Sequence, residues 1–164
     1  MILNREEIVE RIKTEKLVEN FIDLDTQITP NGMDISLSSI SKFKGEGTID
    51  FSNKERIMPE FEEILFIDNG VFLPKGAYKL KSNEILNFPK DMIGIMRPRS
   101  TLLRMGATVD TGVIDAGFSG HLEFLLIVEN QNGIKIKKDA RVVQLLFLKM
   151  KETEKGYDGI YKNL

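Results

Sequence analysis

Turn signals interrupt this chain so often after residue 16 that helical periodicity disappears. The signals are Gly, Pro, Asn and Asp, which suit tight reversals of the backbone. Short apolar runs lie between them, at 33–37, 64–67, 71–73, 92–96, 121–129 and 141–149. Residues 33–37 alternate like a strand, and 68–70 form a hairpin-type turn between the runs 64–67 and 71–73. One strand face would be shared by Leu122, Phe124, Leu126 and Val128. Many short strands separated by turns predict a mainly β chain, folded as a sandwich or a barrel.

One helix is expected, at the N-terminus. Asn4 is a good N-cap residue, and Glu7 stands three residues later, as in a capping box. Ile8 and Ile12 form a short apolar stripe, and the helix is expected to end near Lys16. The chain contains no internal repeat, linker or low-complexity tract, so we expect residues 1–164 to form a single domain.

Composition excludes several classes of function. The net charge of −2 gives no overall attraction to nucleic acid or to an anionic membrane, so any anion site must be local. The chain has no Cys, and His121 is its only histidine, so thiolate and histidine metal clusters are excluded. No apolar run approaches the length of a membrane span, and the N-terminus is acidic; we expect a cytoplasmic protein.

Cations gather in the middle of this slightly acidic chain. Arg99 and Ser100 stand together there, and a guanidinium is well shaped to grip phosphate oxygens with two parallel hydrogen bonds. We expect Leu102 and Leu103 to be buried, so that Arg104 projects from a short helix. The alternative is that these arginines only pair with carboxylates at the surface, where ion pairs are common and weak.

A glycine-rich stretch follows, from Thr111 to Gly117, and it is expected to form a strand that runs into a tight turn. Glycine there lets the backbone approach a ligand closely. Free backbone N–H and C=O groups in such a turn can hydrogen-bond to the edge of a planar base. The carboxylate of Asp115 would then act as a general base toward water. The alternative is that Asp115 is an ordinary turn residue.

These motifs resemble, in order, those of the dCTP deaminase and trimeric dUTPase superfamily. R-S-T-L-L-R at 99–104 is similar to the arginine–serine segment of that family, and T-G-V-I-D-A-G-F-S-G at 111–120 is similar to its aspartate hairpin. Residues 30–34, 140–147 and 156–161 resemble further motifs. The resemblance implies a distorted β-barrel of the dUTPase-like (β-clip) kind with a short N-terminal helix. It also implies a homotrimer whose active sites are shared between subunits.

The resemblance further implies a role for each site residue. Asp115 would be the catalytic base that deprotonates the attacking water, and Phe118 would pack under the deoxyribose and exclude a 2′-hydroxyl. The backbone at Gly112, Val113 and Ile114 would read the edge of the pyrimidine. Magnesium would bind mainly through the triphosphate oxygens, so no protein metal ligand is expected. The other nucleotide contacts would come from Arg99, Ser100, Arg104, Gln144 and Tyr157.

One position separates the two branches of this family. In the metal-free dCTP deaminases, a glutamate five residues after the last glycine of the hairpin activates water beside the cytosine. The corresponding residue here is Leu125, which cannot transfer a proton. Glu123 lies two residues earlier on the same strand face, and a β-bulge would be needed to bring it into place. We therefore expect a dUTP diphosphatase, which converts dUTP and water into dUMP and pyrophosphate.

Two alternatives stay open. If a bulge did place Glu123 at the catalytic position, the protein would be a dCTP deaminase or an enzyme with both activities. A module that senses nucleotides or binds proteins without catalysis would be built on the same fold. Retention of Asp115, Arg99 and Ser100 together speaks against that second alternative.

Residues 151–164 are expected to form a mobile tail that closes on the nucleotide. The segment is polar, yet it contains Tyr157 and Tyr161, which a disordered tail rarely needs. The deaminase pattern has a lysine and a glutamine where this chain has Ile160 and Leu164. The resemblance therefore does not define how this tail would hold the γ-phosphate.

Overall fold

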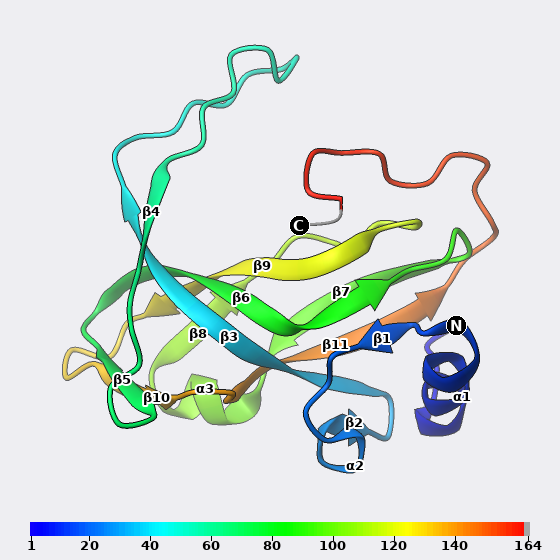
Figure 1. The fold of residues 1–164 in the computed structure, drawn as a ribbon, viewed down its shortest axis with the longest axis horizontal. Helices are drawn as coiled ribbons and strands as arrows, with labels where there is room; N and C mark the ends of the chain where they lie inside the picture. Colours follow the sequence, from blue (N-terminus) through cyan, green and yellow to red (C-terminus); the bar gives the residue numbers. More distant parts are fainter. Residues whose placement is uncertain (163–164) are drawn as a thin grey trace.

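The fold is a nearly closed, barrel-like β-sheet with a short helix at its N-terminus (Figure 1). A computed structural model describes residues 1–162. Its main sheet has the strand order β7-β11-β3-β6-β9-β8, with β1 also paired to β6 and with β2 and β4 paired to β3. Strands β5 and β10 form a separate two-stranded sheet. The predicted mainly β fold is confirmed. The elements are α1 (Arg5–Glu15), β1 (Val18–Glu19), α2 (Leu24–Gln27), β2 (Ile28–Thr29), β3 (Gly32–Lys44), β4 (Glu60–Glu63), β5 (Gly70–Leu73), β6 (Gly76–Asn87), β7 (Met92–Pro98), α3 (Ser100–Arg104), β8 (Ala107–Asp110), β9 (Ser119–Val128), β10 (Ile134–Lys137) and β11 (Arg141–Lys149).

Helix α1 forms where the capping signals predicted it. The Asn4 side chain accepts a hydrogen bond from the backbone N–H of Glu7, and the Glu7 carboxylate accepts one from the backbone N–H of Asn4. The reciprocal pair satisfies two N–H groups that a helix start leaves without partners. The helix ends at Lys16, whose left-handed backbone (φ 54°) stops the spiral, and Ile8 and Ile12 are its buried residues.

Strand β3 runs through the centre of the sheet, between β11 and β6. Its alternating residues, predicted from the sequence, do point to two sides, but both sides are buried. Met33, Ile35 and Leu37 belong to the apolar core, whereas Asp34 and Ser36 are buried among polar partners. The strand therefore separates a hydrophobic core from a buried polar network.

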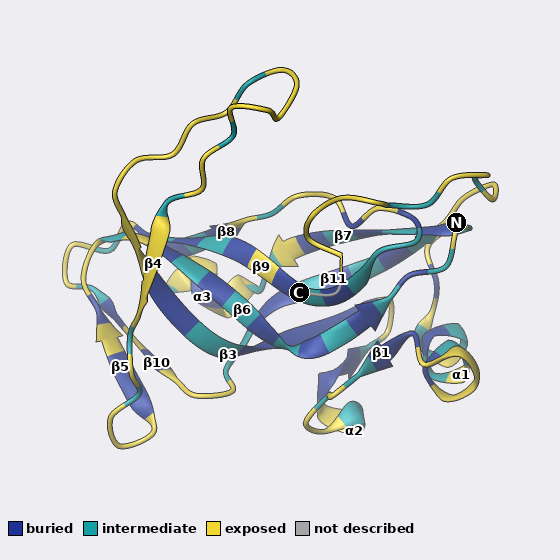
Figure 2. Cartoon of the chain, turned by 45° about the horizontal axis from the view of Figure 1, so that its top comes forward, coloured by how far each residue is buried: buried dark blue, intermediate teal, exposed yellow. Residues whose placement is uncertain are grey.

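Strand β9 confirms the predicted two-residue period. Leu122, Phe124, Leu126 and Val128 are all at most 5% exposed, and the residues between them are less buried. The alternation of dark and lighter segments is visible along β9 in Figure 2. One face of β9 thus closes the core, which leaves the other face free to line a pocket.

Two local predictions need correction. The hairpin expected between 64–67 and 71–73 is reduced to a single bridge between Ile67 and Gly70, and β5 pairs with β10 instead. The strand expected to run from Thr111 into the turn is absent, because β8 ends at Asp110 and Ile114 makes only an isolated bridge to Gly94. In both places a long-range pairing replaces the local one.

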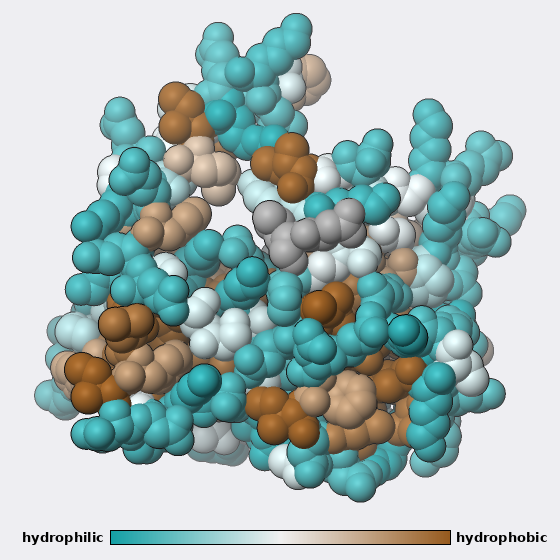
Figure 3. Space-filling view, in the orientation of Figure 1, coloured by the Kyte–Doolittle hydropathy of each residue, from teal (hydrophilic) through white to brown (hydrophobic). Residues whose placement is uncertain are grey.

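A long arm, defined here as residues 45–59, projects from the sheet between β3 and β4 (Figures 1 and 2). Thr48 and Ile57 bridge its two sides. The Asp50 carboxylate accepts hydrogen bonds from the backbone N–H groups of Ser52, Lys54 and Glu55 and so closes the tip. The arm exposes large apolar side chains, which stand out on the hydrophilic surface in Figure 3.

No helix within residues 1–162 combines the length and the apolar character that a membrane crossing requires.

Candidate active site

A pocket with a volume of about 620 Å³ lies under the hairpin 111–118. One side is formed by the hairpin, and the floor by the outward face of β9. Tyr157, Ile160 and Tyr161 of the tail complete it, together with Met58 of the arm and the flanking residues Phe43 and Phe61. Six of the ten predicted site residues line this pocket: Gly112, Val113, Ile114, Asp115, Phe118 and Tyr157.

The hairpin is held against strand β7. Ile114 and Gly94 exchange two backbone hydrogen bonds of 2.9 Å, and the Ile114 side chain is only 4% exposed. Gly117 takes a positive φ of 83° and donates its N–H to the carbonyl of Pro89. The N–H of Phe118 closes the turn on the carbonyl of Asp115 at 3.1 Å. The fixed backbone therefore presents the Asp115 side chain at the exposed end of the turn.

Asp115 is exposed and lines the pocket, and its carboxylate has no hydrogen-bond or ion-pair partner within residues 1–162. A turn aspartate commonly caps its own backbone, as Asp50 does in the arm. The Asp115 side chain makes no such contact. A free carboxylate on a rigid turn beside a pocket has the geometry of a general base.

The hairpin also offers free backbone groups to the pocket. The N–H and C=O groups of Gly112 and Val113 take part in no backbone hydrogen bond within the described chain. A Cβ atom built on Gly112 would meet nothing within 4 Å, so packing within the protein does not require glycine there. Open space beside free amide groups suits the edge of a planar ligand.

The tail packs its backbone directly on the hairpin turn. The N–H of Tyr157 donates to the carbonyl of Ala116 at 2.7 Å. A Cβ atom on Gly117 would lie 2.9 Å from the Cα of Gly156, so the approach requires glycine. The rings of Phe118 and Tyr157 meet edge to face, with centroids 5.7 Å apart. Two aromatic rings from distant segments therefore form one corner of the pocket.

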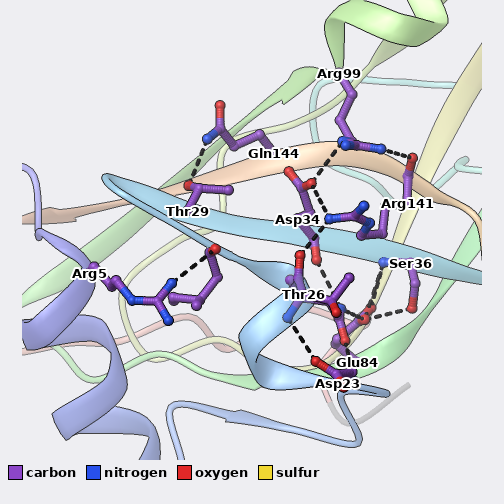
Figure 4. A network of polar contacts seen from close by, with 12 residues as sticks. Arg5, Asp23, Thr26, Thr29, Asp34, Ser36, Glu84, Arg99, Arg141 and Gln144 are labelled. Atoms are coloured by element: carbon purple, nitrogen blue, oxygen red, sulfur yellow. Dashed lines mark hydrogen bonds and ion pairs between the residues drawn. The ribbon is translucent and has the colours of Figure 1, made fainter.

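The predicted phosphate-binding residues lie elsewhere: Arg99, Ser100, Arg104 and Gln144 do not line this pocket. Arg99 Nε is 2.8 Å from Asp34 Oδ2, and Arg99 Nη1 donates to the carbonyl of Arg141 (Figure 4). The side-chain amide of Gln144 donates to the hydroxyl of Thr29 at 2.8 Å (Figure 4).

Ser100 and Arg104 lie on the short helix α3, where Arg104 Nη1 donates to the hydroxyl of Ser100 at 2.9 Å. Both side chains are exposed, as the sequence predicted for Arg104. The prediction that two leucines are buried here was half wrong, since Leu102 is 6% exposed and Leu103 is 52% exposed. A helix of five residues has one buried side, and Leu102 occupies it.

A buried polar network supports the arginines from beneath (Figure 4). Asp34 is 4% exposed and is contacted by Arg99 and by Arg141, whose Nη1 lies 3.2 Å away. Burial raises the pKa of Asp34, and the charges of the two arginines oppose that rise. The Asp34 carboxylate and the Arg141 carbonyl therefore fix Nε and Nη1 of the Arg99 guanidinium.

Glu84 is the other buried carboxyl group of this network, and sequence analysis missed it. It is fully buried and accepts hydrogen bonds from Gln27 Nε2 and from the hydroxyl of Ser36, both at 2.6 Å. Burial raises the pKa of Glu84, and these hydrogen bonds oppose the rise. Glu84 lies within the register shift of β6, between Lys81 and Ile85, and no local sequence signal indicates that shift.

Sequence analysis also missed an ion pair on the pocket floor. Lys79 Nζ of β6 lies 2.8 Å from Glu123 Oε1 of β9 and 3.8 Å from the centroid of the Phe61 ring. Lys79 is directly opposite Leu125 in the antiparallel pair. Lys79 and Glu123 meet only because β6 pairs with β9. The sequence around Lys79 therefore did not indicate the ion pair.

Comparison with known proteins identifies the family. The sequence model of the dCTP deaminase-like family matches residues 2–150. A protein of Archaeoglobus fulgidus, named probable deoxyuridine 5′-triphosphate nucleotidohydrolase, is 45% identical over 98% of this chain and 95% of its own length. A Methanosarcina barkeri protein of the same name is 47% identical over 92% of this chain and 89% of its own. A Methanocaldococcus jannaschii protein, named deoxyuridine 5′-triphosphate nucleotidohydrolase, is 39% identical over 88% of this chain and 94% of its own length.

A solved structure supports the fold. The 2′-deoxycytidine 5′-triphosphate deaminase of Agrobacterium tumefaciens superposes with a TM-score of 0.67 and 21% identity over 89% of this chain. The match spans 47% of that longer chain, and at this identity it bears on the fold alone. The family match over residues 2–150 and the archaeal relatives together show that this chain belongs to the dCTP deaminase-like family.

Proposed function

We propose that the protein is a dUTP diphosphatase, which hydrolyses dUTP to dUMP and pyrophosphate. The observation that carries this proposal is the free carboxylate of Asp115, held at the rim of the pocket by a rigid hairpin. The names of the archaeal relatives describe the same reaction.

Asp115 is the general base of the proposed reaction. Its carboxylate takes a proton from a water molecule, and the water oxygen bonds to the α-phosphorus of the nucleotide. The bond from the α-phosphorus to the oxygen that bridges it to the β-phosphorus then breaks, and pyrophosphate leaves with that oxygen. Positioning and neutralisation of the phosphate charge supply the rest of the rate enhancement.

The pocket walls bind the nucleoside part. The free backbone groups of Gly112 and Val113, next to the fixed Ile114, hydrogen-bond to the edge of the pyrimidine. Phe118 packs under the deoxyribose, and Tyr157 limits the movement of the Phe118 ring by its edge-to-face contact. A ring in that place leaves no room for a 2′-hydroxyl, so ribonucleotides are excluded.

The site is completed by further copies of the chain in a homotrimer. Arg99, Ser100, Arg104 and Gln144 hold the triphosphate, yet they do not line the pocket that contains Asp115. A separation of base and phosphate groups onto different surfaces supports an active site shared between subunits.

Magnesium accompanies the substrate and neutralises part of the phosphate charge. Within residues 1–162, no group of three or more His, Asp or Glu side chains is arranged to hold a metal ion. In the proposed reaction the cation keeps much of its hydration and binds mainly through phosphate oxygens. Asp115 takes the proton from water, and the arginines neutralise the phosphate charge.

The deaminase alternative loses support from the geometry of β9. The required bulge would have to lie at Glu123, but the pairs Lys81–Glu123, Leu80–Phe124 and Lys79–Leu125 are consecutive. The register shift lies in β6 instead, between Lys81 and Ile85. Leu125 thus stays on the pocket floor, and Glu123 is engaged by Lys79.

Product analysis tests the proposal. Purified protein with Mg²⁺ is given dUTP or dCTP, and the nucleotides are separated by chromatography. We expect dUMP from dUTP and no change in dCTP. If dCTP also yields dUMP, the enzyme deaminates as well; if both nucleotides bind and neither changes, the protein is a binding module.

Two expectations stay predictions. One is the cytoplasmic location. The other is a mobile tail over 151–164 that closes on the nucleotide; its last two residues, including Leu164, lie outside the described chain.

A further inference from the structure

The tail contacts the body of the protein at two separate places. The first is the hairpin, where the N–H of Tyr157 donates to Ala116 and Gly156 packs on Gly117. The second is the arm, where the hydroxyl of Tyr161 donates to the Sδ atom of Met58 at 3.5 Å. Between these two anchors the tail has only a few residues, so its path is fixed at both ends.

The path between the anchors crosses the pocket. Ile160, Tyr161 and Met58 line the same pocket as Asp115 and Phe118. Residue Lys162 turns back and donates its N–H to the carbonyl of Gly159, which completes a compact turn at this point. The segment between the two anchors therefore forms part of the pocket wall.

Two residues of the arm, Arg56 and Met58, contact Tyr161 of the tail. The guanidinium carbon of Arg56 lies 5.9 Å from the centroid of the Tyr161 ring, within the range of a cation–π contact. Met58 offers a polarisable sulfur, which favours the neighbourhood of aromatic rings. Both residues belong to an arm that contributes no side chain to the hydrophobic core, so core packing does not explain them.

The base of the arm is fixed to the pocket floor. Phe43 of β3 and Phe61 of β4 meet edge to face, with ring centroids 5.7 Å apart. Lys79 Nζ lies over the Phe61 ring, 3.8 Å from its centroid, and is paired with Glu123. The ion pair that the proposed reaction does not use thus anchors the arm beside the pocket.

We infer that the arm is the fixed half of a clasp, in which Arg56 and Met58 act as positioning residues that hold Tyr161 and so keep the tail closed over the bound nucleotide. The inference rests on the proposed function, because it assumes that the nucleotide occupies this pocket. The contacts of the clasp are partly exposed and individually weak, so the tail opens readily for substrate entry and product release.

Steady-state kinetics with dUTP test the clasp. Met58→Ala and Tyr161→Ala are each expected to raise KM about fivefold, with kcat changed less than twofold. The double variant is expected to match the single variants, because each change opens the same contact. Met58→Leu, which keeps an apolar side chain of similar size but loses the sulfur that Tyr161 contacts, is expected to raise KM by less than Met58→Ala does.

Phe51→Ala is the matched control, since Phe51 is a fully exposed apolar residue at the tip of the same arm. It is expected to leave KM unchanged. If Met58→Ala and Tyr161→Ala leave KM unchanged, or if their effects multiply in the double variant, the clasp is overturned.

Limited trypsin digestion separates the clasp from the proposed reaction. In the parent, cleavage after Lys155 is expected to slow when dUTP with Mg²⁺ is present, and in Met58→Ala this protection is expected to be lost. If the parent hydrolyses no dUTP but the two proteins still differ in protection, the clasp is supported and the diphosphatase proposal is wrong. If the parent hydrolyses dUTP and both proteins are protected equally, the diphosphatase proposal is supported and the clasp is wrong.

Discussion

The carboxylates in the pocket under the hairpin and in the arginine network on β3 and β11 differ in burial and in their hydrogen-bond partners. In the pocket, Asp115 is exposed and has no partner within the described chain. In the network, Asp34 and Glu84 are buried and satisfied by several donors. A free carboxylate is available for chemistry, whereas a satisfied one fixes its neighbours. The comparison predicts that replacing the free carboxylate of Asp115 affects catalysis, whereas replacing the buried carboxylates of Asp34 and Glu84 affects stability.

The largest effect is expected from Asp115→Asn in the pocket. The substitution removes the base and keeps the shape, so kcat should fall by about 10²–10⁴-fold, with nucleotide binding retained. The free energy of unfolding should stay within about 0.5 kcal/mol of the parent, because no partner is lost. Turnover assays and urea unfolding measure the two quantities. Turnover at the parent rate would show that another group is the base.

The next largest effect is expected from Asp34→Asn in the network. The change removes the charge that holds Arg99 and Arg141, and should lower the free energy of unfolding by about 2–3 kcal/mol. Asp25→Asn is the control, because its side chain is 96% exposed and it pairs with Arg5 only at the surface. Equal losses of stability in both variants would contradict the distinction between the two regions.

A smaller effect on specificity is expected from Phe118→Ala. Loss of the ring opens space beside the sugar, so the preference for dUTP over UTP, as a ratio of kcat/KM values, should fall about tenfold. Phe72→Ala removes an exposed ring outside the pocket and should leave the ratio unchanged. Equal turnover of UTP and dUTP by the parent would refute the assigned role of Phe118.

The smallest effect is a pH dependence that comes from Glu84. Burial raises its pKa above the usual 4.5, so the folded protein binds this proton more tightly than the unfolded chain does. Its contribution to stability is complete below about pH 4.5 and decreases as pH rises through the raised value. Urea unfolding of the parent and of Glu84→Gln from pH 4 to 7 should therefore show the parent losing stability relative to the variant. A constant difference would contradict the raised pKa.

The predictability of the two regions also differs. The hairpin residues around Asp115 are contiguous in the sequence, so their motif and glycines indicated the site directly. Glu84, Gln27 and Lys79 gave no signal, because their partners lie up to 57 residues away. The wrong prediction for Leu103 and the missing strand at Thr111 have the same origin, since long-range packing decides which local preference is realised.

The sequence by itself determined the β-rich fold, the capped helix α1, the family and the candidate base Asp115. These follow from local features, namely turn residues, capping pairs and contiguous motifs, which act over a few residues. Only the tertiary structure decided that Asp115 stays free while Asp34 and Glu84 are buried, and that the tail lies against the arm. Burial and partnership depend on which strands pair, and strand pairing joins residues that no local pattern connects.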